Sequence, residues 1–455
     1  MRKIKKSIFL LLFMLLSSTL FSQDITGTWY GELEVREVRI PLVIKIYKTG
    51  NGYHAYMDSP KQNAYDIPMA RTSYADGNLL LIANEGFSYR GFLSQGEING
   101  KFKQNGLEFP LTFTREKFAE ETPAEPEPEP EDTRVFASED ILFENHEAGI
   151  TLAGTLTLPL QGNNFPAVVL ISGSGPQNRD EEIFGKKPFL NLSDFLTRNG
   201  IAVLRFDDRG VGKSEGDFST ATSADFATDV NAAIDYLLTR ERIDKNNIGL
   251  IGHSEGGIIA SMITASSNKV DFLVLLASPG LPGNELLLMQ NEALGRASGM
   301  SEEQLEAAKK INQKTYDIIR NSPQNSLKSD LTAHLKENTP WTDEQIHANI
   351  ESLASPWYVA FVKHDPRINL EKTKVPVLAI NGSKDLQVPA EANLKAIETA
   401  LKKGGNLKVT TKIFPDLNHL FQKSKTGLPS EYGQLGVPFS DGVKEFISDW
   451  ILKQT

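Results

Sequence analysis

Hydrophobic and polar positions follow two different patterns along the chain, and the change falls near residue 118. Over residues 24–117, short runs such as TWYGELEV, PLVIKIYK and LEFPLTFT alternate apolar with polar positions. Glycine and asparagine turn signals separate these runs, for example at 50–52 and 99–100, which is typical of β-hairpins. We therefore expect residues 24–117 to form a small all-β domain, an antiparallel barrel or sandwich.

The second pattern begins at about residue 135, where buried apolar runs alternate with amphipathic helical segments. In one such segment, Phe226, Val230, Ile234 and Leu237 share a helix face. Apolar strands that alternate with helices are typical of a mostly parallel sheet covered on both faces. After an opening β pair at 141–144 and 152–158, the strand-like runs are 167–172, 201–206, 248–253, 271–277, 375–380 and 408–414. The sequence thus predicts a doubly wound α/β domain over residues 135–455.

Two segments interrupt these patterns. Residues 118–134 contain the run AEETPAEPEPEPED, which buries nothing and repels itself, so we expect an extended linker. Residues 281–370 form a long helical insertion between two strands, and a connection of this length is typical of a cap over a site.

Residues 1–22 have the three parts of a secretory signal peptide. A basic head with Arg2, Lys3, Lys5 and Lys6 precedes the apolar run 8–16 and a small, polar tail at 17–22. The apolar run is short for a membrane span, so the alternative of a retained anchor is less favoured. We expect an exported protein, periplasmic or extracellular, without a stable membrane anchor.

Composition narrows the possible partners. The net charge of −10 at pH 7 and a pI of about 5.4 disfavour binding to nucleic acid or to an anionic membrane surface. The chain has no cysteine, which removes disulfides, zinc–thiolate sites and a cysteine nucleophile. The sequence indicates no metal or organic cofactor and leaves the oligomeric state open.

The candidate nucleophile lies in the stretch IGLIGHSEGGIIASM, where 252–256 fit the pattern G-x-S-x-G. The pattern follows an apolar run and precedes a helical run of small residues. In a strand-turn-helix of this kind, the serine stands at a sharp turn and its neighbours must be small. Ser254 is therefore the candidate nucleophile.

A serine nucleophile needs a base and a carboxylate that orients the base. In hydrolases built on such a turn, the acid and then the histidine follow the serine at the ends of later strands. Asp385 follows the run VPVLAI, and His419 follows the run KVTTKIF. Asp416, on the same loop as His419, is a less favoured alternative acid, and His253 is expected to be structural with its side chain directed away from the nucleophile.

The oxyanion of an acyl-transfer reaction needs two backbone donors. The N–H of Glu255 is the first candidate, and the N–H of Ser174, in the glycine-containing loop after the first apolar strand, is the second. The segment 172–176 lacks the third glycine of a dinucleotide-binding loop, and 207–214 lacks the frame of a P-loop, so nucleotide binding is not favoured.

Five motifs together resemble those of bacterial α/β-hydrolase-fold serine carboxylesterases, over nearly the whole of residues 135–455. They are SGSGPQNRDE (172–181), RFDDRGVGKS (205–214), GHSEGG (252–257), NGSKDLQVP (381–389) and LNHLFQ (417–422). The resemblance implies an esterase of short acyl chains with the triad Ser254, Asp385 and His419. Ser172 departs from the pattern, since many such hydrolases have histidine there.

Two further points remain open at this stage. Trp357, Tyr358 and Phe361 of the insertion are candidate lining residues of an acyl pocket, or packing residues of an amphipathic helix. The start at 27–29, Gly-Thr-Trp, resembles the G-x-W start of lipocalin-like barrels. The β domain either binds a ligand or merely positions its neighbour, and the second is favoured because no convergent polar cluster is evident.

The resulting prediction is an exported serine hydrolase that cleaves small-molecule carboxylic esters through an acyl-enzyme. Two alternatives remain: an aminopeptidase or dipeptidyl-peptidase-like serine peptidase, and a binding protein with a vestigial hydrolase domain. Substrate choice is expected to depend on the insertion at 281–370.

Overall fold

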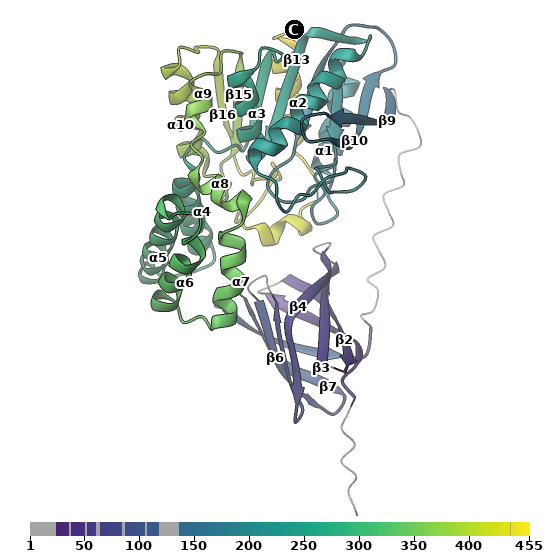
Figure 1. Cartoon of the computed structure of the whole chain (residues 1–455). Coiled ribbons are helices and arrows are strands. Elements are labelled where there is room, and N and C mark those ends of the chain that lie inside the picture. Colours follow the sequence, from purple (N-terminus) through teal and green to yellow (C-terminus); the bar gives the residue numbers. More distant parts are fainter. Residues whose placement is uncertain are drawn as a thin grey trace, which may run out of the picture.

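A computed structural model describes residues 24–35, 38–50, 52–60, 64–83, 87–104, 107–117, 136–436 and 438–455. The expected signal peptide and the expected linker lie outside these residues. The described chain forms an all-β barrel and an α/β domain with helices inserted between two of its strands (Figure 1). This architecture confirms the predicted fold class.

The N-terminal domain is a closed antiparallel barrel in which each strand pairs with the next and β1 pairs with β8. Its strands are β1 (Gly27–Val35), β2 (Val38–Thr49), β3 (Gly52–Ser59), β4 (Ala64–Ala75), β5 (Asn78–Ala83), β6 (Phe87–Ser94), β7 (Glu97–Gln104) and β8 (Leu107–Thr114). Large side chains such as Trp29, Tyr89 and Phe113 fill the interior, as expected of a barrel of eight strands. Arg115 lies over the Trp29 ring, 3.8 Å from its centre.

The second domain contains an eight-stranded sheet in the order β16-β15-β14-β13-β11-β12-β10-β9. Its strands are β9 (Phe136–Asn145), β10 (Ile150–Pro159), β11 (Phe165–Ile171), β12 (Ala202–Phe206), β13 (Ile243–His253), β14 (Phe272–Leu276), β15 (Val377–Gly382) and β16 (Val409–Phe414). Strands β11 to β16 are parallel, whereas β9 and β10 are antiparallel to their neighbours. The carboxyl ends of β11, β13, β15 and β16 therefore meet at one edge.

Helices cover both faces of this sheet. α1 (Pro188–Arg198) and α11 (Asp441–Leu452) pack with one apolar cluster. α2 (Ser223–Thr239), α3 (Glu255–Ser266), α9 (Arg367–Leu370) and α10 (Ala390–Lys403) pack with the other. Burial on both faces explains why the strands read as continuous apolar runs.

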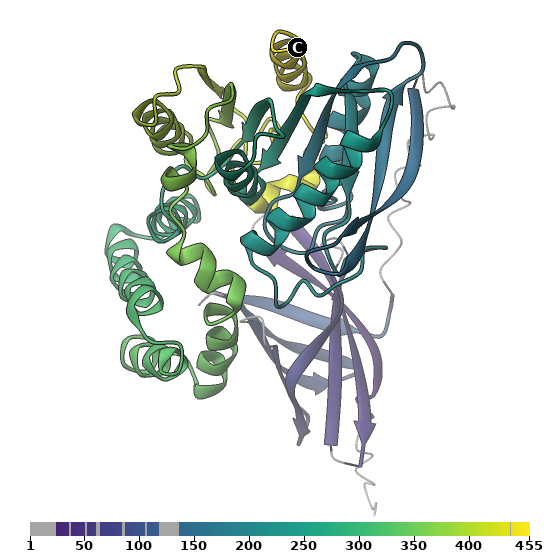
Figure 2. The ribbon, with the colours of Figure 1, turned by 45° about the horizontal axis from the view of Figure 1, so that its top comes forward.

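The predicted insertion forms a cap of five helices followed by α9. These are α4 (Gly283–Ala297), α5 (Glu302–Asn321), α6 (Leu327–Asn338), α7 (Asp343–Leu353) and α8 (Pro356–Lys363). They enclose a core of their own, and α4 and α8 also contact residues of the α/β domain. Figure 2 shows the cap, in green, beside the α/β sheet and next to the barrel. Arg71 of β4 and Glu344 of α7 form an exposed ion pair of 3.4 Å between barrel and cap.

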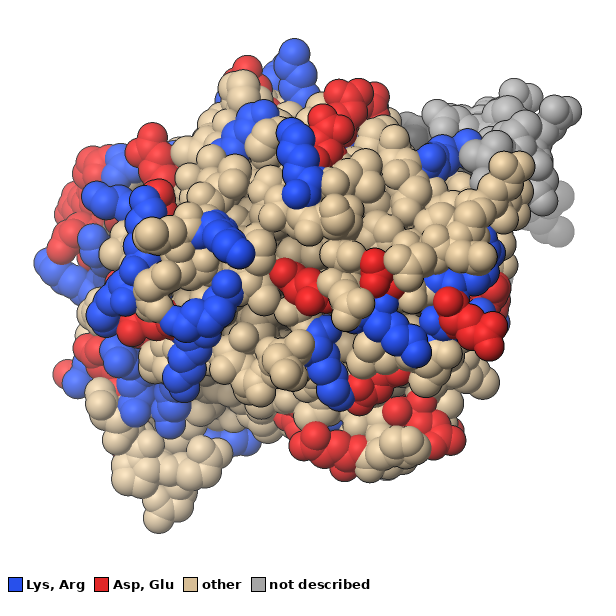
Figure 3. All heavy atoms as spheres, turned by 90° about the horizontal axis from the view of Figure 1, so that it is seen from above, with Lys and Arg blue, Asp and Glu red and all other residues tan. Residues whose placement is uncertain are grey.

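The surface seen from above carries both signs of charge. Basic side chains are most frequent at the left of this view, with acidic ones among them (Figure 3). This mixture provides no uniformly basic surface on the face shown. Among the helices described, none is long and apolar enough to cross a membrane.

Candidate active site

Ser254 stands at a sharp turn between β13 and α3, as the pentapeptide predicts. Its backbone has φ 52° and ψ −121°, in a region that side-chain-bearing residues rarely adopt. A Cβ on Gly252 would lie 2.2 Å from the carbonyl oxygen of Gly256, and one on Gly256 would lie 2.2 Å from that of Ile171. Both glycines are therefore required by the close passage of the backbone.

The structure joins the expected acid and base directly. Asp385 follows β15, His419 follows β16, and the His419 Nδ1 atom lies 2.7 Å from Asp385 Oδ2. Asp385 Oδ1 also accepts hydrogen bonds from the backbone N–H groups of Gln387 and Val388, each at 2.8 Å. These donors fix the carboxylate, which in turn orients the imidazole ring.

Ser254 and His419 line one pocket, although no hydrogen bond joins them in this structure. Catalytic hydrogen bonds often form fully only when substrate is bound. Asp416, the alternative acid, is exposed and lies 3.5 Å from Lys384 Nζ. The structure thus groups the favoured three residues and leaves Asp416 outside the group.

The two expected oxyanion donors lie beside the serine. Glu255 is the first residue of α3, so its N–H has no acceptor within the helix. In the loop after β11, the Gly173 N–H donates to Glu181 Oε1 at 2.8 Å. No hydrogen bond from the Ser174 N–H occurs among the described residues, so this group remains available, as the sequence suggests.

Three carboxylate side chains hold this loop, which we call the oxyanion loop (172–177); of these residues the sequence analysis named only Glu255, and only for its backbone N–H. Glu181 binds Gly173, as above. Asp208 accepts from the Ser172 hydroxyl at 2.8 Å and from the Gln177 N–H at 2.9 Å. Glu255, through its side chain, accepts from Ser223 Oγ at 2.6 Å and from Trp357 Nε1 at 2.8 Å, and also bonds to the Ser174 side chain.

Burial makes two of these carboxylates hard to ionise. It raises the pKa of Asp208 to about 7, and the nearby Glu181 and Glu255 carboxylates act in the same direction. Burial also raises the pKa of Glu255. The sequence signal that could have identified Glu181 and Asp208 is their place within two of the longer motifs, 172–181 and 205–214.

The motif at 205–214, which contains Asp208, forms ion pairs with neighbouring segments and is not a phosphate-binding loop. Arg209 binds Asp229 of α2 through Nε and a terminal nitrogen, at 2.7 and 2.9 Å. Asp207 pairs with Arg179 at 2.7 Å. These buried and partly buried pairs connect the loop after β12 to its neighbours.

Ser223 begins α2 but does not cap it. Thr222 is the N-cap and forms a capping box with Asp225. Ser223 is the first helical residue, and its hydroxyl is directed to Glu255.

The pocket around Ser254 has a volume of 230 Å³ and is partly formed by the cap. Trp357 and Phe361 line it, with their rings stacked 5.4 Å apart, together with Leu286 and Val388. Tyr358 does not line it: its ring lies in the cap core, where it bonds to Tyr316. On a helix, successive residues point about 100° apart, so Tyr358 and Trp357 face different sides.

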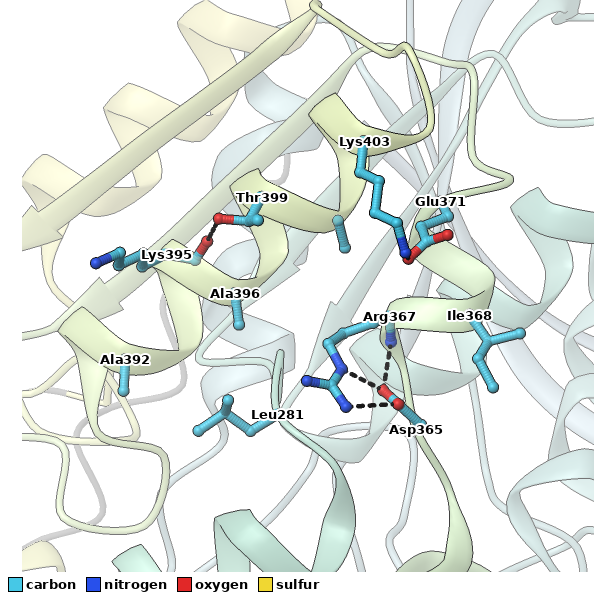
Figure 4. A pocket seen from close by; sticks show the side chains of 11 residues that line it. Leu281, Asp365, Arg367, Ile368, Glu371, Ala392, Lys395, Ala396, Thr399 and Lys403 are labelled. Carbon is cyan, nitrogen blue, oxygen red and sulfur yellow. Dashed lines mark hydrogen bonds and ion pairs between the residues drawn. The ribbon is translucent and has the colours of Figure 1, made fainter.

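A larger hollow of 770 Å³ lies elsewhere, between α10 and the segment 365–371. Figure 4 shows Arg367 directed to Asp365, and Lys403 directed to Glu371. No serine or histidine lines this hollow. The candidate active site is therefore the smaller pocket, which Ser254 and His419 line. In the described parts of the chain, no group of three or more His, Cys, Asp or Glu residues could hold a metal ion.

The sheet, the turn at Ser254 and the order of acid and base define an α/β-hydrolase. A family model described as "Serine aminopeptidase, S33" matches residues 187–423, just over half of the chain, so the protein belongs to this family. The chain is 29% identical over 367 residues to esterase EstD of Thermotoga maritima, covering 78% of each protein. These comparisons confirm the predicted class of hydrolase.

Solved structures that match this chain include an esterase and Est1E. An esterase of Pyrococcus furiosus has a TM-score of 0.44 and 15% identity, covering 70% of this chain and 91% of that one. The ferulic acid-bound Est1E of Butyrivibrio proteoclasticus has a TM-score of 0.43 and 19% identity, covering 69% and 98%.

The raised pKa of Asp208 predicts that stability falls as pH rises. The folded protein holds the Asp208 proton more tightly than the unfolded chain, whose pKa is 3.8. This contribution is full below pH 4 and is lost as pH rises through about 7. Between pH 5 and 8 the free energy of unfolding should fall by about 2–3 kcal/mol more in the wild type than in Asp208→Asn.

Denaturant unfolding at several pH values measures this difference. The amide introduced by Asp208→Asn can still accept from the Gln177 N–H and bond to Ser172, so the variant should fold. Asp217→Asn, at an exposed position, is the control and should keep the wild-type slope. The same slope in Asp208→Asn and the wild type would contradict the prediction.

Proposed function

We propose that the protein is a serine carboxylesterase acting on small esters with short acyl chains. The main support is the arrangement of Ser254 on its strained turn, in one pocket with a His419 ring already held by Asp385 at 2.7 Å. The esterase named among the curated relatives agrees with this proposal.

In the first step, His419 removes the Ser254 proton as the serine oxygen attacks the ester carbonyl. The carbonyl electron pair moves to oxygen, and the N–H groups of Glu255 and Ser174 stabilise the negative charge. When the intermediate collapses, the bond to the alcohol breaks and His419 gives its proton to the leaving alcohol. The acyl group remains bonded to Ser254.

In the second step, water replaces the alcohol. His419 removes a proton from water, and the hydroxide attacks the acyl carbonyl through a second oxyanion. Collapse releases the carboxylic acid and returns the proton to Ser254. Asp385 holds the His419 ring in orientation throughout and stabilises its protonated form.

The residues that line the pocket favour ester substrates over peptide substrates with a free amino terminus. An accessible carboxylate binds an ammonium group strongly, through a charge-assisted hydrogen bond. Among the described residues that line the pocket, Glu181 is the only carboxylate, and it is buried against His253 at 2.7 Å. The volume of 230 Å³ suits an acyl group of about two to six carbons.

Aminopeptidase activity remains the second candidate because the matching family carries that description. The signal-peptide pattern at residues 1–22 supports export of the enzyme, so we place its ester substrates outside the cytoplasm.

Removal of the Ser254 hydroxyl tests the mechanism. Ser254→Ala should lower kcat for a short-chain nitrophenyl ester by about 10⁴-fold or more, because no other group can form the acyl-enzyme. The melting temperature should change by only a few degrees. Ser261→Ala on the same helix, whose hydroxyl binds the Ile258 carbonyl, is the matched control and should keep kcat within about threefold. Full activity in Ser254→Ala would refute the assignment.

A substrate panel separates the two candidate activities. We expect kcat/KM for acetyl to hexanoyl esters to exceed that for aminoacyl anilides by at least about 10²-fold, and activity to decline for longer acyl chains. Leu287→Ala, which enlarges the pocket at a half-buried cap position, should move the optimum to longer chains. A preference for aminoacyl anilides would favour the aminopeptidase.

A further inference from the structure

A buried pair of side chains, His253 and Glu181, lies immediately behind the candidate nucleophile. His253 Nδ1 is 2.7 Å from Glu181 Oε1, and both side chains are about 6% exposed. His253 is the residue before Ser254, and the sequence predicts that its side chain is directed away from the nucleophile. The structure instead places its ring beside that of His419, with 4.7 Å between the ring centres.

This pair connects three parts of the site. Glu181 Oε1 accepts the Gly173 N–H of the oxyanion loop at 2.8 Å. His253 Nε2 lies 3.0 Å from the backbone carbonyl oxygen of His419. His253 itself belongs to the turn that carries Ser254. One hydrogen-bonded unit thus reaches the oxyanion loop, the nucleophile turn and the histidine loop.

The hydrogen-bond partners of the His253 ring determine which of its nitrogen atoms carry a proton. A backbone carbonyl oxygen only accepts, so His253 Nε2 must carry a proton. Nδ1 faces a carboxylate oxygen that already accepts from Gly173, so a proton on Nδ1 completes the contact. Burial by itself would lower the pKa of His253, but the Glu181 charge and hydrogen bond outweigh it and raise that pKa.

We infer that His253 and Glu181 form a buried ion pair that positions the oxyanion loop and the His419 loop against the turn that carries Ser254. This inference rests on the proposed hydrolase function. Each member of the pair is the charged partner of the other, and each also holds a separate loop through a second hydrogen bond. Loss of either member should therefore misplace groups that act on the transition state.

Other groups around His419 come from three elements. Asp385, after β15, contacts the His419 Nδ1 atom at 2.7 Å. Tyr432 of the 3-10 helix η2 (Pro429–Gln434) binds the His419 backbone. Glu181 faces His253 rather than the His419 ring. Among these neighbours, only His253 connects the His419 backbone to Glu181 and the oxyanion loop.

The test uses His253→Gln and Glu181→Gln in the full-length protein. In His253→Gln, the amide can still donate to the His419 carbonyl, but the positive charge is gone. The rate of Ser254 labelling by a fluorophosphonate should fall by at least about tenfold, because Glu181 is left without its charged partner and no longer fixes the oxyanion loop. In Glu181→Gln, kcat for a short-chain ester should fall at least about tenfold, with KM within about twofold, because the oxyanion loop acts on the transition state.

The control is His334→Gln in the cap, where Nε2 likewise contacts a backbone carbonyl, that of Ile311, at 3.1 Å. This variant should leave both the labelling rate and kcat unchanged. The double variant Glu181→Gln/His253→Gln replaces the ion pair by two amides and leaves no unpaired buried charge, so it should fold even if a single variant does not. It should show the same loss of kcat as Glu181→Gln.

A labelling rate and a kcat that stay within about twofold of the wild type in both His253→Gln and the double variant would overturn the inference. Equal changes of kcat and KM in Glu181→Gln would also overturn it. Failure of the proposed function has a different signature, since the wild-type protein would then not be labelled at Ser254 at all.

Discussion

The tight passage of the backbone at Ser254 is the constraint on which the rest of the site depends. A methyl group on Gly252 of β13 would overlap the carbonyl oxygen of Gly256 in α3, and one on Gly256 would overlap that of Ile171 in β11. Ser254 adopts a strained φ of 52°. This conformation directs its side chain to the edge of the sheet where the parallel strands end. It also leaves the first N–H of α3 free for an oxyanion.

Around this turn, the protein uses buried carboxylates to hold loops that have little regular structure. Asp208, Glu181 and Glu255 each bond to a different part of the oxyanion loop. Glu255 also binds Trp357 of the cap, so the same side chain connects the nucleophile turn to the pocket wall. Such groups are costly to bury unless each finds donors, and the hydrogen bonds supply them.

The sequence predicts the parts of the site that depend on local pattern and chain order. The pentapeptide marks the turn, and in a parallel sheet residues after successive strands meet at one edge, which brings Asp385 to His419. The roles of Glu181 and Asp208 depend on which loops touch, which no local pattern shows. Tyr358 and Trp357 are adjacent in sequence, yet only the packing of α8 decides which of them faces the pocket. The prediction that His253 is structural, with its side chain directed away from the nucleophile, did not indicate that its ring lies beside that of His419.

The central claim is that Ser254 is a nucleophile activated by His419. Mass spectrometry of peptides from protein treated with a fluorophosphonate measures this directly. The account predicts one adduct, on Ser254, formed at least about 10²-fold more slowly in His419→Ala. An adduct on another residue, or labelling of Ser254 at the same rate without His419, would contradict it.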